Sequence, residues 1–70
     1  MNNVVKFYTA LAVLRENTEC SFWGEINSED DFNNIEWKTG VDANGVTIST
    51  TTCPHSEITW TALKAEMDKL

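Results

Sequence analysis

The sequence predicts an α+β fold with an N-terminal helix, a three-stranded antiparallel meander and a C-terminal helix, both helices lying on one face of the sheet. Three observations support it. Apolar residues recur at helical spacing near each end of the chain, and the middle alternates between apolar and polar residues. An Asn-Gly pair at 44–45 separates two β-prone stretches, which is typical of a hairpin. Seventy residues leave room for one domain, residues 1–70.

The first helix is predicted over residues 4–14. Asn2 or Asn3 can cap it with a side-chain oxygen, and Asn17 tolerates the left-handed geometry in which helices end. Val13 would point away from the core. The expected buried stripe has a spacing of three and four residues and comprises Val4, Phe7, Tyr8, Leu11 and Leu14.

Two strands should follow, joined by a turn. Residues 20–26 alternate, and this pattern predicts a half-buried strand with Phe22 and Ile26 on its core face and Trp23 on the other. The polar cluster at 27–31 is typical of a turn. The second strand is predicted over 33–38, with Ile35 and Trp37 directed to the core.

The rest of the chain predicts a third strand and a second helix. Residues 46–52 form the strand, with Val46 and Ile48 directed inward, and Pro54 stops it because proline has no N–H for the ladder. The helix begins after Thr59, a good N-cap, and Ile58 can pack on it as a hydrophobic staple. Its expected apolar stripe is Trp60, Leu63, Met67 and Leu70.

Charge and hydropathy limit the classes of partner. The net charge is −6, from eleven acids and five bases, and residues 16–38 hold seven of the acids. We find no basic patch of the kind that contacts phosphates, so we expect no direct nucleic-acid binding. The apolar run at 4–14 is too short to cross a membrane and lacks a basic leader, so we expect neither membrane insertion nor a secretory signal. Cys20 and Cys53 should then be reduced thiols in a cytosolic setting.

The sequence lacks some of the residues that a catalytic or metal-binding site would need. His55 is the only histidine, and although Cys53 could approach it on a strand end, a nucleophile pair also needs an orienting third group. Cys20, Cys53 and His55 offer three ligands, whereas a structural zinc site normally has four. The motif that starts at Asp42 resembles the opening of a calcium loop but lacks the closing glutamate. We therefore expect no catalytic residue, no metal and no cofactor, and a protein that is not an enzyme.

Three tryptophans are the one excess in the composition. Trp37 and Trp60 fall on predicted core stripes, whereas alternation places Trp23 on the polar face of the first strand. An exposed tryptophan within a polar field is a common interface anchor. The alternative is that a loop or the Asn-Gly arm folds over Trp23. The expected partner-binding surface on the open sheet face comprises Trp23, Glu25, Asn34, Glu36, Lys38 and Thr47.

Short motifs carry a resemblance to a known class of proteins. They are F-W-G-E at 22–25, I-E-W at 35–37 and I-T-W-T-A-L-K-A-E-M-D-K-L at 58–70. With the apolar first helix, these motifs resemble small modules of marine tailed phages, especially cyanophages, often beside tail or other virion genes. The resemblance covers residues 4–38 and 54–70. It implies a structural or accessory protein in the virion or host cytoplasm that contacts a virion component or a host protein.

Two functions from different classes follow. The first is this phage-type protein, which acts through protein–protein contacts and self-associates weakly at most. The second is an acidic decoy or inhibitor whose carboxylates imitate nucleic-acid phosphates for a host protein, as the acidic block 16–36 suggests. Binding by a phosphate mimic should weaken steeply as salt rises, and this dependence separates the two functions.

Overall fold

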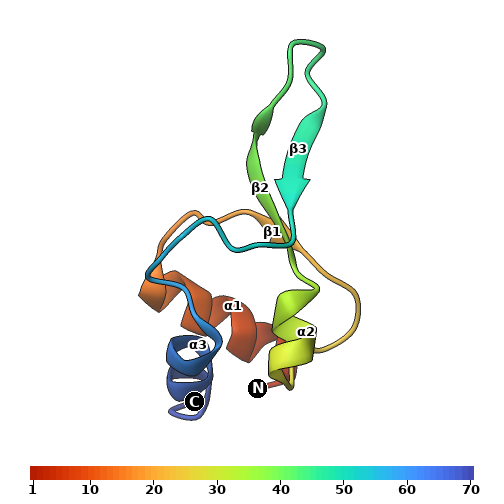
Figure 1. Cartoon of the computed structure of the whole chain (residues 1–70). Helices are drawn as coiled ribbons and strands as arrows, with labels where there is room; N and C mark the ends of the chain where they lie inside the picture. The colour runs from red at the N-terminus through yellow and green to blue at the C-terminus, as the bar shows by residue number, and fades with distance from the viewer.

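The computed structural model describes all residues, 1–70, and confirms the α+β class. Helix α1 (Asn3–Leu14) is followed by β1 (Cys20–Ser21), α2 (Glu29–Asn33), β2 (Glu36–Val41), β3 (Thr47–Thr50) and α3 (Trp60–Met67). The strands form one antiparallel sheet in the order β1-β2-β3. The three helices gather around the base of the sheet, and the β2–β3 hairpin projects from it as an arm (Figure 1). The molecule is accordingly elongated, with extents of 41 × 21 × 20 Å.

Helix α1 begins as predicted, and its buried face overlaps the predicted stripe at Phe7, Leu11 and Leu14 but is rotated away from Val4 and Tyr8. The side chain of Asn2 accepts a hydrogen bond from the Val5 N–H and caps the helix. Phe7, Ala10 and Leu11 are buried, whereas the predicted stripe members Val4 and Tyr8 are exposed. The small Ala10 side chain suits the close packing of α1 on α3. Val13 is exposed, as predicted, and Asn17 has a positive φ of 60° in the turn after the helix.

The segment between α1 and β2 differs most from the prediction. The first strand ends at Ser21 and does not reach Ile26, because the chain bends at Trp23 and Gly24, where φ is +73°. In the predicted turn at 27–31, residues 29–31 are instead the first turn of α2. Ser28 caps this helix by accepting a hydrogen bond from the Asp31 N–H. The three acidic residues in its first turn interact favourably with the positive end of the helix dipole.

Strand β2 starts three residues later than predicted because Asn33 ends α2. Ile35 and Trp37 are fully buried, as predicted. An irregularity between Lys38 and Gly40 shifts the register of the ladder. The strand continues to Val41, beyond the reach of the helical core.

The hairpin turn and the third strand also depart from expectation in detail. Only Gly45, with φ of +80°, has positive φ, so the turn is not the Asn-Gly type in which both residues do. Asp42 organises it by accepting from the Asn44 and Val46 N–H groups. Strand β3 spans only Thr47–Thr50, and the predicted inward residues Val46 and Ile48 are 59% and 46% exposed. The helices do not extend far enough to cover them (Figure 1).

Helix α3 is close to its prediction. Thr59 accepts from the Ala62 N–H as the N-cap, and Ile58 is buried, as the staple expects. Leu63 and Met67 are buried, whereas Leu70 lies beyond the helix end and is exposed. The single core draws on all three helices, β2 and the loops around them: Phe7, Ala10, Leu11, Ile26, Phe32, Ile35, Trp37, Ile58, Leu63 and Met67.

Candidate functional site

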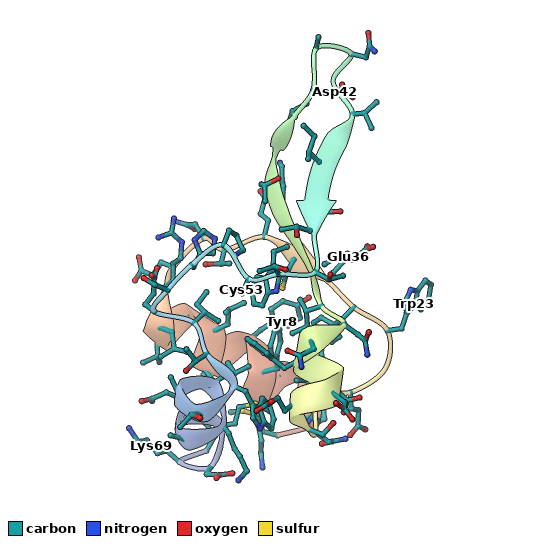
Figure 2. All side chains as sticks on the ribbon, in the orientation of Figure 1. Tyr8, Trp23, Glu36, Asp42, Cys53 and Lys69 are labelled. Carbon is teal, nitrogen blue, oxygen red and sulfur yellow. The ribbon has the colours of Figure 1, made fainter.

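Trp23 is the most exposed large apolar side chain in the molecule, at 99% of its full accessibility. It lies in the loop between β1 and α2 and points outward from the body of the protein (Figure 2). The expectation of exposure is confirmed. The expected location on a strand face is wrong, because β1 ends at Ser21 and the chain has left the sheet two residues later.

The loop that carries Trp23 is held at both of its ends. Before it, the ring of Phe22 packs edge-on against Phe7, with ring centroids 4.8 Å apart, and contacts Tyr8 at 5.7 Å. After it, Ile26 is buried, and its backbone is bonded in both directions by the side chain of Asn3. The Ile26 N–H donates to Asn3 Oδ1 at 2.8 Å, and Asn3 Nδ2 donates to the Ile26 carbonyl at 3.0 Å.

Gly24 makes the bend between these anchors possible. Its φ of +73° falls in the left-handed region, which disfavours side chains. Apart from its chain neighbours, no residue has an atom within 4 Å of the place where its Cβ would be, so glycine is required for backbone conformation and not for space. The anchored loop therefore holds the Trp23 side chain exposed to solvent.

A surface hollow of about 670 Å³ lies beside Trp23. It is lined by six residues: Ser21, Phe22, Trp23, Asn34, Glu36 and Thr51. Asn34 follows α2, and its amide donates to the Asp30 carbonyl. Three of the six predicted partner-binding residues, Trp23, Asn34 and Glu36, thus meet in one concavity.

The other three predicted residues stand further away. Lys38 and Thr47 line a second hollow of about 370 Å³ on the sheet, which shares Ser21 and Glu36 with the first. Lys38 Nζ is paired with Glu19 at 2.7 Å. Glu25 lines neither hollow, because the loop turns it toward the Asn27 amide, which donates to it. The sequence placed Phe22 on the core side, as observed, but it did not indicate that the Asn3 side chain holds the loop.

The acids next to Trp23 in the sequence take part in no salt bridge. None of the four salt bridges includes an acid from the stretch 25–36, which contains Glu25, Glu29, Asp30, Asp31 and Glu36. The four bridges instead use four of the five basic residues elsewhere, in the pairs Arg15–Glu57, Lys38–Glu19, Lys64–Asp68 and Lys69–Glu66. Glu36, which lines the hollow beside Trp23, therefore has no ion-pair partner.

The cysteines show no sign of activation. Both are free and partly buried. Burial, and then the nearby Cys53, raise the pKa of the Cys20 thiol to about 11, and burial also raises the pKa of Cys53. Cys53 Sγ contacts the backbone carbonyl of His55 at 3.6 Å, not its imidazole. A nucleophilic cysteine needs a lowered pKa, so neither thiol has the character of a catalytic one.

Neither a metal centre nor a membrane span is found. No group of three or more histidine, cysteine, aspartate or glutamate side chains is arranged to hold a metal ion. None of the helices has both the length and the apolar character needed to cross a bilayer. Comparisons with protein-family models, with curated proteins and with solved structures found no match.

Proposed function

We propose that this chain is a small non-enzymatic protein that works by binding another protein through Trp23. The observation that supports the proposal is the near-complete exposure of this side chain on a loop that is anchored at Phe22 and Ile26. A tryptophan in water leaves a large apolar area hydrated, and burial of that area against a partner would stabilise a complex. The anchored loop also reduces the entropy lost on binding.

The charges around Trp23 suggest the chemistry of the partner. Glu36 lines the hollow beside Trp23, and no acid of α2 takes part in a salt bridge. A matching surface would have an apolar pocket for the indole with lysine or arginine side chains at its rim. The net charge of −6 disfavours nucleic acid and anionic membrane surfaces as direct partners.

We place this protein among phage-type structural or accessory proteins, in the virion or the host cytoplasm. This part of the proposal rests on the resemblance of residues 22–25, 35–37 and 58–70 to small cyanophage modules. The partner would then be a virion component or a host protein.

An acidic decoy is the second candidate, and α2 provides the observation that favours it. Glu29, Asp30 and Asp31 are consecutive in its first turn, and none has a cation partner. A decoy would use these carboxylates as phosphate substitutes on a nucleic-acid-binding host protein. Trp23 would be secondary in that case.

Capture from host lysate distinguishes the two candidates. The tagged chain is compared with Trp23→Ala and with Val13→Ala, which truncates an exposed side chain on α1. Each capture is repeated at low and raised salt. We expect the partner to be lost with Trp23→Ala, retained with Val13→Ala and released only partly by salt. Capture that survives Trp23→Ala but collapses with salt would favour the decoy.

A further inference from the structure

We propose that the open edge of β3 pairs with β3 of a second copy of this chain, joining two three-stranded sheets into one. Strand β3 is the last strand in the order β1-β2-β3, and no segment runs along its outer side (Figure 1). An unpaired strand edge is a template for another strand. This proposal does not depend on the role of Trp23.

The hydrogen bonds of the hairpin identify which backbone groups face outward. The Val46 carbonyl accepts from the Asp42 N–H, and the Ile48 carbonyl accepts from the Thr39 hydroxyl, so both carbonyls point toward β2. Backbone groups alternate in direction along a strand. The N–H and C=O groups of Thr47 and Ser49 therefore point to the open edge.

The charge pattern favours a second copy as the occupant. Two molecules with a net charge of −6 repel each other over most of their surfaces. Asp42 is the only charged residue between Lys38 and Glu57, and in the hairpin turn its carboxylate accepts from the N–H groups of Asn44 and Val46. Strand β3 itself thus carries no carboxylate, and Glu19 and Glu36, which line a hollow with Thr47 and Ser49, belong to the segment before β1 and to β2. Strand β3 also lacks the lysine or proline with which natural edges prevent pairing.

A twofold arrangement centred on Ile48 gives every outward N–H and C=O group of Thr47 and Ser49 a hydrogen-bond partner. Antiparallel pairing that sets Ile48 opposite Ile48 of the second copy places Thr47 opposite Ser49 on both sides of the axis. Both outward-facing residues of each strand then exchange their N–H···O bonds. The two half-exposed Ile48 side chains meet as a cross-strand pair on the same sheet face as Trp37.

Concentration and salt provide the first test. Because β3 is only four residues long, we expect a weak dimer with a dissociation constant on the order of 100 µM to 1 mM. Sedimentation equilibrium of the full chain should show association that strengthens as salt rises, because salt screens the repulsion between two acidic copies. A mass that stays monomeric up to about 2 mM in 0.5 M salt would overturn the proposal, since screening is then nearly complete.

Matched variants test the register. Ile48→Lys puts two cations at the twofold axis and should abolish the dimer. Val41→Lys makes the same change of charge on β2, at a similarly exposed position on the opposite face, and should leave the dimer intact. Ser49→Pro removes only an outward N–H, so it should keep the hairpin and weaken the dimer by tenfold or more. Circular dichroism checks that each variant is folded. A dimer that survives both Ile48→Lys and Ser49→Pro, or that Val41→Lys removes, would contradict this interface.

Discussion

Truncation of Leu63 should remove a large part of the stability of this protein. Leu63 is fully buried on α3 and belongs to the single hydrophobic core. Loss of a buried leucine side chain costs about 2–5 kcal/mol, because the transfer energy and the cavity both count. A 70-residue chain at about 0.05–0.15 kcal/mol per residue has a total of roughly 4–10 kcal/mol. Leu63→Ala therefore removes a third or more of the free energy of unfolding in most of that range.

Urea unfolding, followed by tryptophan fluorescence, measures this loss. Trp37 is fully buried and should report the transition. With a slope of about 1 kcal/mol per molar urea, the midpoint should fall by at least about 2 M. Val13→Ala is the control, because Val13 is 64% exposed on α1 and should change stability by no more than about 0.5 kcal/mol. Equal losses in the two variants would refute the helix packing described above, unless dilution shows that Val13 is buried between copies.

Four further predictions concern the thiols and the Trp23 loop. Thiol titration of the unfolded protein should find both Cys20 and Cys53 free, and the absence of free thiols would indicate a disulfide. In the native protein, the pKa of Cys20 near 11 should leave roughly two orders of magnitude less thiolate at pH 8 than an ordinary cysteine has. The raised pKa of Cys20 means that the folded state favours the neutral thiol, so its contribution to stability is present below about pH 8.5 and is lost as pH rises toward 11, which melting temperatures between pH 8 and 11 would reveal. Asn3→Ala should cost about 1–3 kcal/mol and speed hydrogen exchange at Ile26, because it leaves both backbone groups of Ile26 without their partner; unchanged exchange would mean that Asn3 does not hold the loop. Gly24→Ala should cost about 1–2 kcal/mol in a melting experiment through backbone strain alone, and no loss would contradict the left-handed bend.

Capping residues explain why two helices could be predicted and one could not. Asn2 and Thr59 each precede a segment in which apolar residues recur at helical spacing, so the capping residue and the periodicity indicate the same helix start. Helix α2 has only five residues, too few to show a period, and its asparagine, serine and aspartate residues are equally typical of turns. The Ser28-x-x-Asp31 spacing was the signal that could have identified it.

Alternation predicted the direction of side chains better than it predicted the backbone. Phe22 packs inward, Ile26 is buried and Trp23 is exposed, although the chain from Phe22 to Ile26 is a loop. The positive φ of Gly24 was the local property that the pattern could not show. For Ile48 the predicted face was correct but the predicted burial was not. It lies on the same side of the sheet as Trp37, yet it is exposed, because a strand pattern does not indicate where the covering helices end.

The partner-binding surface was predicted in part. Trp23, Asn34 and Glu36 meet in one hollow, although the three residues come from a loop, a helix end and a strand and not from one sheet face. Lys38 and Thr47 remain on the adjoining sheet surface, and Glu25 is turned away toward Asn27.

Fluorescence quenching tests the central claim most directly. Acrylamide is titrated into the native protein and into Trp23→Phe, with the melting temperature of each recorded. We expect Trp23→Phe to remove the most quenchable emission at the longest wavelength and to leave the melting temperature unchanged, because Trp23 is 99% exposed while Trp37 is fully buried. Quenching that is the same in both proteins, or a melting temperature that falls by several degrees, would place Trp23 in the core and contradict its role as a binding anchor.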